Sequence, residues 1–293
     1  MPSTPNLNIA GNSAVYTLGR ELAKITEFAH DFAPDYNAAG GVVKMPVLAA
    51  QAGLFDKTSN NYEQSSTVDT ASITLDKQYV SGFEVTPQQM SDGLGAYAGL
   101  FKQMGEDAGR AIARSVEAAV VGQVKSTTNT PAELVLTKAG FAGLYKTTMD
   151  ANLAPSNACL VLNPTAYSKL IEVLGMDVVN LESAVETGKI DNFLGFKRVL
   201  VSASVDSGLL GFIAERRAIG VAGRKVPLLD GYPVYEEFTD ADTGIPATLV
   251  GFLKYATGSY YITATALFGT AVTRAASVVP LVAPSGSNDE SNG

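Results

Sequence analysis

The chain has 293 residues, of which 46% are hydrophobic and 17% are charged, and its formal net charge is −8. This apolar content supports a sizeable core and excludes wholesale disorder. The acidic balance argues against a protein that grips nucleic acid by neutralising phosphates, but it allows one that encloses nucleic acid without gripping it. Soluble globular chains carry roughly 25% charged residues. Either the surface of this Gly- and Ala-rich chain is modestly polar, or much of it is buried against copies of itself, since interface cores are depleted in charge. We favour the second interpretation.

The N-terminal region is predicted to be a flexible polar arm followed by a short helix. Residues 1–13 are rich in Pro, Asn and Ser and lack the basic and apolar regions of a signal peptide. Residues 14–32 place apolar side chains from Leu18 to Phe28 close to helical spacing. Pro34 is expected to end this amphipathic helix, because proline disfavours helical geometry in the residue before it.

A long, projecting hairpin is predicted next. A strand-like run begins at residue 42, and residues 51–71 then supply few aliphatic side chains and many Ser, Thr and Asn. A connection of this length is uncommon in a compact domain and usually marks a functional or extended loop. The returning strand has a period of two, typical of a half-buried strand, in Ile73, Leu75, Tyr79, Phe83 and Val85.

The end of that strand is followed by a helix start and the longest helical pattern of the chain. Thr86 is a good N-cap, Pro87 suits the first helical position, and Gln89 completes a capping box. Residues 95–125 keep one face apolar, and at 1.5 Å per residue they span roughly 45 Å. Such a helix is expected to act as a rigid strut.

Beyond residue 127 the pattern alternates between helices and strands. The strand Cys159–Leu162 runs into Asn163 and Pro164, an N-cap followed by proline at the first helical position. This alternation predicts a mixed α/β unit.

The C-terminal part is predicted to be a β-meander with a disordered tail. From Ile245 onward the chain is rich in Thr, Val, Tyr and Ala, with turn signals at Gly258 and Gly269. Its apolar stretches are interrupted by charges and proline, and none approaches the roughly 20 apolar residues of a membrane helix. Residues 283–293 are polar and are expected to be disordered.

No motif for catalysis is evident. His30 and Cys159 are the single histidine and cysteine, so a Cys–His dyad would need both and no intramolecular disulfide can form. Cys159 lies in the apolar run ACLVL, where cysteine is most often an inert small hydrophobe. No glycine-rich stretch has the spacing of a phosphate loop.

The charged clusters also have ordinary interpretations. The densest acidic cluster resembles the start of a calcium loop but lacks its fifth and twelfth ligands, so a solvated turn is favoured; it comprises Glu236, Glu237, Asp240 and Asp242. A basic group could contact phosphates or pair with carboxylates of a neighbouring copy; it comprises Arg216, Arg217, Arg224 and Lys225. We predict no enzyme and no catalytic, cofactor-binding or metal site. The alternative is an enzyme whose carboxylates converge only in the folded chain.

The order of these elements resembles a known family. The stretch ITLDKQYVSGFEVTPQQMSD (73–92) and the helix GAYAGLFKQMGEDAGRAIARSVEAAVVGQV (95–124) resemble the hairpin strand and long helix of tailed-bacteriophage major capsid proteins of the Hong Kong 97 type. The later runs LGFKRVLVSASV and GFIAERRAIGVAGRKVP and the closing GYPVYEEFTDADTGIPATLVGFLKYATGSYYIT continue the resemblance in order. The likeness lies in arrangement and texture, and it implies an α+β fold.

The resemblance implies an anatomy for the chain. An N-terminal arm would be followed by an extended loop lying across a neighbouring subunit, a peripheral domain with a spine helix, and an axial domain around five- and six-fold axes. In order, these are the arm 1–41, the extended loop 42–86, the peripheral domain 87–127 with 245–282, the axial domain 128–244, and the disordered tail 283–293.

The same resemblance implies a function and partners. The subunit would self-assemble as hexamers and pentamers into an icosahedral virion shell, assembled in the host bacterial cytoplasm, that encloses double-stranded DNA without reading its sequence. A separate scaffolding protein, a portal and a possible cement protein are the expected partners, with no cofactor and no membrane. Some relatives cross-link subunits through a loop lysine; Lys57 lies in that segment, but no acceptor is identifiable and no cross-link is expected. The alternatives are an encapsulin-type compartment enclosing cargo enzymes and another self-associating phage component, such as a tail protein.

Overall fold

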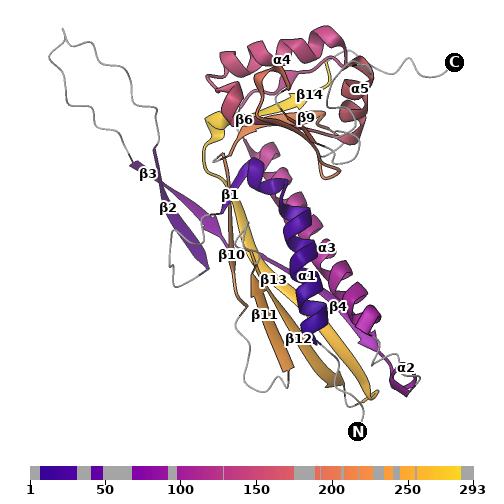
Figure 1. Ribbon diagram of the computed structural model, residues 1–293. Coiled ribbons are helices and arrows are strands. Elements are labelled where there is room, and N and C mark those ends of the chain that lie inside the picture. The colour runs from indigo at the N-terminus through magenta and orange to yellow at the C-terminus, as the bar shows by residue number, and fades with distance from the viewer. Residues whose placement is uncertain are drawn as a thin grey trace.

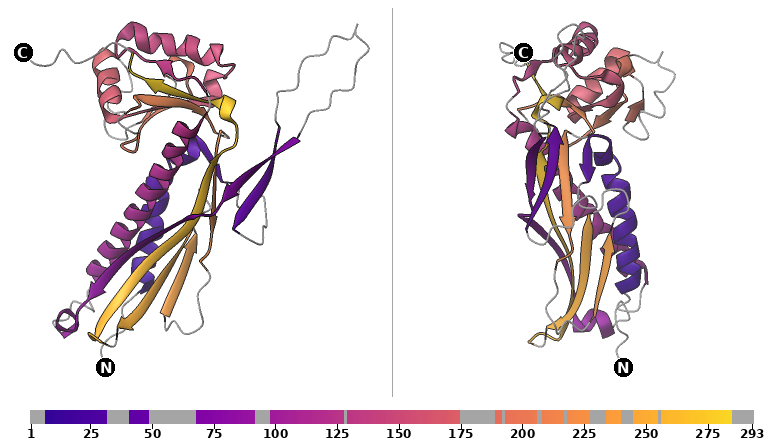
Figure 2. Two further views of the ribbon diagram at one scale, coloured as in Figure 1. Left: turned by 180° about the vertical axis from the view of Figure 1, so that it is seen from behind. Right: turned by 90° about the vertical axis from the view of Figure 1, so that its left-hand side faces the viewer.

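Two sheets, two long helices and a projecting hairpin make up the fold, which is α+β as predicted (Figure 1). The computed structural model describes residues 7–31, 41–48, 68–91, 98–127, 129–174, 189–191, 193–205, 208–216, 218–226, 234–239, 245–254 and 256–284. We call the long sheet with its two helices the lower body and the second sheet with its helices the upper body. Figure 2 shows the two bodies stacked end to end.

The lower body is built around a long strand, β13 (Ser259–Val272). Each of three strands, β12, β10 and β4, pairs antiparallel with β13. The strand order is β1-β10-β13-β12-β11, with β4 pairing β13 off this path. The other strands are β1 (Ala29–Asp31), β4 (Lys77–Val85), β10 (Ile219–Arg224), β11 (Val234–Thr239) and β12 (Pro246–Lys254).

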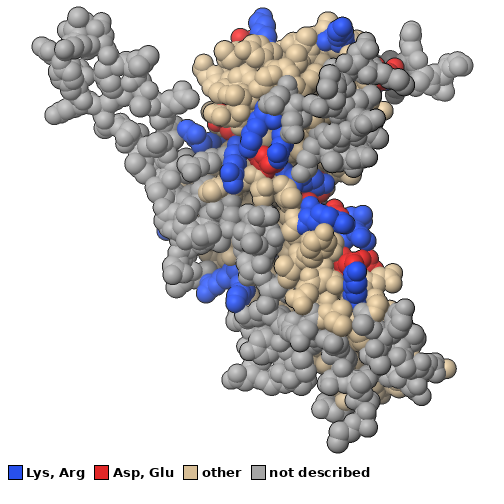
Figure 3. Space-filling model, in the orientation of Figure 1, with Lys and Arg blue, Asp and Glu red and all other residues tan. Residues whose placement is uncertain are grey.

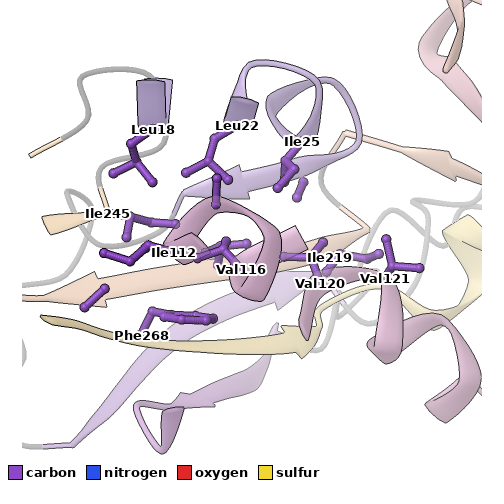
Figure 4. Close-up of a cluster of buried hydrophobic side chains, with 14 of the residues drawn as sticks. Leu18, Leu22, Ile25, Ile112, Val116, Val120, Val121, Ile219, Ile245 and Phe268 are labelled. Atoms are coloured by element: carbon purple, nitrogen blue, oxygen red, sulfur yellow. The ribbon is translucent and has the colours of Figure 1, made fainter. Parts of the chain in front are cut away.

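Helices α1 (Leu7–Leu22) and α3 (Ala98–Gly122) lie side by side against one face of this sheet (Figure 1). Their backbones nearly touch, because a Cβ on Gly105 would lie 2.1 Å from the Ala10 carbonyl oxygen. Figure 4 shows α1, α3 and the sheet contributing side chains to one apolar core, among them Leu18, Ile112 and Phe268. This contact makes the lower body a single packed unit.

The N-terminal prediction was wrong at both ends of the helix. It begins at Leu7, within the segment predicted as a polar arm, because small side chains such as Ala10 and Ala14 pack against α3. It ends at Leu22, and the chain continues through the short 3₁₀ helix η1 (Ile25–Glu27) into β1.

The capping box that follows β4 is confirmed. The Gln89 backbone N–H donates to Thr86 Oγ1 over 3.3 Å, and the Thr86 N–H donates to Gln89 Oε1 over 2.9 Å. The helix begun there is α2 (Pro87–Ser91), and α3 continues into the 3₁₀ helix η4 (Gln123–Ser126). Residues 92–97, between α2 and α3, lie outside the described residues.

The upper body contains a second sheet, in the order β5-β14-β9-β6-β8-β7. One face is covered by α4 and α5, through side chains such as Phe141 and Leu170, and the other joins the core of the lower body through Val161 and Phe212. The Asn163 cap is confirmed, since the Ala166 N–H donates to Asn163 Oδ1 over 2.7 Å. The strands are β5 (Ala132–Glu133), β6 (Ala158–Leu162), β7 (Lys189–Asp191), β8 (Arg198–Val201), β9 (Gly211–Glu215) and β14 (Val278–Val282), and the helices are α4 (Lys138–Asp150), α5 (Pro164–Leu174), η5 (Pro155–Asn157) and η6 (Phe193–Gly195).

The two sheets do not follow the expected division of the chain into residues 128–244 and residues 245–282. Strands β10 and β11 pair in the lower body, whereas β14 leaves the predicted meander and pairs with β9 and β5 in the upper body. Before it lies the 3₁₀ helix η7 (Ala275–Ser277). The chain therefore crosses between the bodies more often than the sequence pattern indicated.

The hairpin comprises β2 (Val42–Leu48) and β3 (Val68–Thr74), paired antiparallel from Val42–Thr74 to Leu48–Val68. Figures 1 and 2 show it standing away from the lower body. The predicted returning strand is split, because Leu75 and Asp76 separate β3 from β4, and β4 pairs with β13 in the lower body. Among the described residues of the segment 42–86, those of β2 and β3 therefore stand away from the lower body, whereas those of β4 belong to its sheet.

Candidate assembly surfaces

The single cysteine and the single histidine lie in different sheets, Cys159 in β6 of the upper body and His30 in β1 of the lower body. Cys159 is buried in β6, and its thiol donates a hydrogen bond to the Glu27 carbonyl oxygen over 3.4 Å. Burial, followed by the nearby Glu27 carboxylate, raises the pKa of the Cys159 thiol to about 11. Because the thiolate is the reactive form, this cysteine is a poor nucleophile near neutral pH. His30 lies in β1, where its Cα partner is Gly220.

The charged clusters are only partly described. Glu236 and Glu237 lie in β11, and Arg216, Arg224 and Lys225 are exposed. The remaining candidates lie outside the described residues: Lys57, Arg217, Asp240 and Asp242. Among the residues that the structure describes, no group of three or more His, Cys, Asp or Glu could hold a metal ion. No described helix is long and apolar enough to cross a membrane.

The root of the hairpin is held by a small apolar cluster of its own. Val43 and Ile73 pack on Ala222 of β10, and each of the three is at most 5% exposed. Beside them the chain passes very close to β13: a Cβ on Gly269 would lie 2.0 Å from the Thr74 carbonyl oxygen. The sequence pattern treated Gly269 as a turn, which is wrong. It lies inside β13, where the lack of a side chain lets β3 approach.

The face of the lower sheet opposite the helices offers a broad surface. Ile262, Ala264 and Ala266 of β13 are buried toward the helices, so the alternate residues point to the opposite face. That face mixes hydroxyl and apolar side chains. Val80 of β4 is exposed, Phe252 of β12 and Tyr261, Thr263 and Thr265 of β13 are half-buried, and Thr248 and Val250 of β12 are buried. Such a surface suits adaptable contacts with another chain.

Near the β12–β13 turn this face carries a cluster of fixed polar and aromatic groups. Phe252 and Tyr261 stack with ring centroids 5.6 Å apart, and Lys254 Nζ lies 5.6 Å from the Tyr261 centroid. Hydrogen bonds from Ser259 and then Tyr261 lower the pKa of Glu84, and the bond to Glu84 raises the pKa of Tyr261. These contacts bring together side chains of the three neighbouring strands β4, β12 and β13.

On one face of the molecule the described charged side chains can be followed in Figure 3. On the face seen in Figure 3, described Lys and Arg side chains lie in separate groups, several with carboxylates beside them. Pairs such as Arg110–Asp107 and Lys102–Glu106 neutralise part of this charge. The described surface in this view therefore offers no continuous basic stripe to a polyanion.

No family model matches the sequence, and no curated protein matches it. Solved structures do match. The capsid of a native GTA particle aligns with a TM-score of 0.61 at 12% identity, covering 91% of both chains. The fold is that of a phage capsid protein. The capsid of cyanophage P-SCSP1u matches this capsid fold with a TM-score of 0.54 at 14% identity, covering 87% of this chain and 86% of the other.

A virus-like particle has a similar fold. The virus-like particle of Pyrococcus furiosus aligns with a TM-score of 0.55 at 13% identity, covering 93% of this chain and 97% of that chain. The predicted resemblance to tailed-phage capsid proteins is thus confirmed at the level of the fold.

Proposed function

We propose that this chain is the major capsid subunit of a tailed bacteriophage, which self-assembles through hexamers and pentamers into an icosahedral shell around double-stranded DNA. The observation that carries the proposal is a fold shared over 91% of the chain with the capsid subunit of the GTA particle. The role is structural and not enzymatic, the subunit resides in the virion, and assembly takes place in the host cytoplasm.

In this proposal the two bodies take the two roles of the family's anatomy. The lower body, with α3 as its spine, is the peripheral domain, and the upper body is the axial domain. The strand pairings support new bounds, in which β10 and β11 belong to the peripheral domain and β14 to the axial domain. The extended loop is then residues 42–74, and the N-terminal arm includes α1.

The hairpin and the open sheet face are the proposed contacts between subunits. A two-stranded hairpin is marginally stable in water. At its root, Val43 and Ile73 pack on Ala222, with the partly buried Ala71, Leu75 and Ala271 beside them. A neighbouring subunit would stabilise the rest. The half-exposed face around Val80 and Tyr261 suits a hairpin from a neighbour, because hydroxyl side chains can exchange hydrogen-bond partners between slightly different positions.

The partners proposed beyond the subunit itself are a separate scaffolding protein, a portal and a cement protein. DNA would be enclosed without sequence-specific contacts, which fits basic side chains that lie in separate groups beside carboxylates. A compartment shell around cargo protein is the second candidate, favoured by the match to the Pyrococcus furiosus particle.

Electron microscopy of the purified full chain tests the proposal, with the protein expressed alone and together with its neighbouring genes. We expect closed icosahedral shells, or rings of five and six subunits, and nuclease-resistant DNA in particles made during infection. Closed shells filled with one cargo protein and free of DNA would instead support the compartment. A uniform monomer or dimer in both preparations would refute both shell functions.

A further inference from the structure

The segment Lys24–Phe28, which contains η1, is held between α3 and the upper sheet. Glu27 pairs with two residues at the start of β8: Lys197 Nζ lies 2.9 Å from Glu27 Oε2, and Arg198 pairs with Glu27 Oε1. The backbone carbonyl of Glu27 accepts the hydrogen bond from Cys159 in β6. One short segment therefore contacts neighbouring strands of the upper body.

The same segment is tied to the lower body by a second carboxylate. Lys24 Nζ lies 3.0 Å from Glu117 Oε2 on α3, and Ser202 donates to Glu117 Oε1 over 2.6 Å. Ser202 follows β8, so Glu117 links α3 to the N-terminal segment and to the upper body at once.

Both carboxylates are largely removed from water. The side chain of Glu117 is 9% exposed and that of Glu27 is 15% exposed. A partly buried carboxylate loses hydration and depends on its partners, so removing a partner is far more destabilising than losing a surface ion pair. Phe28 adds an apolar contact, with its ring edge-on to Phe212 of β9 at 5.4 Å between centroids.

The chain also passes between the two bodies at other points, and hydrogen bonds join these crossing segments to one another. Asn129, beyond η4, donates from Nδ2 to the carbonyl oxygens of Ala275 and Val278. The Thr273 N–H donates to the Ala218 carbonyl oxygen over 2.9 Å. These bonds hold the crossings together, and the upper sheet also packs on the lower body through apolar side chains such as Val161 and Phe212.

We propose that Lys24–Phe28, with Glu27 and Glu117, is a latch that sets the angle between the two bodies. When the latch is formed, the upper body is fixed against α3 as seen here. When it opens, the crossings act as a hinge and the upper body turns. Its use rests on the proposed function, because a subunit that meets different neighbours in pentamers and hexamers needs more than one angle.

The single cysteine reports on the latch directly, since the segment that must move accepts the hydrogen bond of its buried thiol. We would measure the rate at which a disulfide reagent labels Cys159 in the native full chain. We expect Glu27→Gln and Glu117→Gln each to raise that rate about tenfold or more, a change equivalent to about 1.4 kcal/mol. Glu172→Gln is the matched control, because Glu172 forms an exposed 2.7 Å pair with Lys169 on α5. It should label at the wild-type rate.

Two outcomes would overturn the latch. Glu27 itself helps to raise the pKa of Cys159, whereas Glu117 is not among the charges that act on this thiol. Faster labelling in Glu27→Gln alone would therefore reflect thiol ionisation. The equilibrium constant for global unfolding is measured in parallel by urea titration. If the labelling rate of Cys159 rises only by the same factor as this constant, the variant is destabilised as a whole and the latch is not involved. Neither outcome bears on whether shells form, so the latch and the shell can fail independently.

The angle itself can be measured in a cysteine-free background. Spin labels at K169C on α5 and K102C on α3, both in exposed positions, report the distance between the upper and lower bodies. We expect a single narrow distribution in the parent and a broadened or shifted one in Glu117→Gln. An unchanged distribution would refute the hinge.

Discussion

The contact between α1 and α3 gives the most direct test of the packing, because one substitution should have opposite effects at two positions of the same helix. A Cβ on Gly105 would lie 2.1 Å from the Ala10 carbonyl oxygen, and one on Gly109 would lie 2.5 Å from that of Ala14. A Cβ on Gly122 would meet nothing within 4 Å. Gly109→Ala must therefore push the helices apart, whereas Gly122→Ala fits without movement.

The magnitudes follow from two opposing terms. Alanine in place of glycine favours a helix by about 1 kcal/mol. Overpacking a tight contact destabilises by about 1–3 kcal/mol, and an obstructing backbone carbonyl cannot rotate away as a side chain can. We expect Gly109→Ala to lower the free energy of unfolding by up to about 2 kcal/mol and Gly105→Ala, whose approach is closer, by more. Gly122→Ala should raise it by up to about 1 kcal/mol.

Urea or thermal unfolding of the three variants beside the parent provides the assay. For a chain of this size 1 kcal/mol corresponds to a shift in Tm of about 2–4 °C, so the two signs are separable. If Gly109→Ala proves as stable as Gly122→Ala, the backbone contact between α1 and α3 is refuted.

Three further predictions concern the hairpin, a cap and the thiol. Gly269→Val should displace β3 and reduce shell yield in electron micrographs while leaving the circular dichroism of the subunit native, whereas Gly41→Ala, with nothing within 4 Å of its Cβ, should assemble normally. Thr86→Ala should lower the free energy of unfolding in urea by about 0.5–2 kcal/mol through loss of the cap bond to Gln89. The pKa of Cys159 rises on folding from 9.0 to about 11, so its contribution to stability is full below pH 9 and is lost as pH rises toward 11. That loss, of about 2–3 kcal/mol, should be absent from unfolding curves of Cys159→Ala.

The features predicted correctly from the sequence are those whose causes are local. The caps at Thr86 and Asn163 need only side chains three residues apart, and both bonds are present. The run through Phe83 was correctly identified as a strand. Its partner was not, because a period of two shows that one face is buried but not which strand lies beside it. The structure pairs it with β13, and so this part of the predicted hairpin belongs to the lower body.

The contacts between the segment Lys24–Phe28 and the upper body could not be predicted from the sequence. Glu27 and Lys197 are 170 positions apart in the chain, and nothing around either residue marks it as one of a pair. Gly269 does carry a signal in the sequence, but the signal has two meanings, because glycine favours both turns and close approaches of the backbone. Only the position of β3 distinguishes the two meanings.

The sizes of these contacts suggest how one chain could serve in different positions of a shell. The lower body shares one extensive core, whereas the fully buried residues at the hairpin root are, in the part of the chain that the structure describes, Val43, Ile73 and Ala222. Burying a large aliphatic side chain contributes about 1.5–3 kcal/mol, so the root holds the hairpin by roughly 5 kcal/mol. A standard-size interface buries about 800 Å² on each partner, far more surface than these side chains cover at the root. In an assembled shell the neighbour would therefore set the hairpin's direction, while the lower body keeps its shape. Shells of this protein should accordingly show hairpins that differ in angle between pentamers and hexamers, above lower bodies that superimpose.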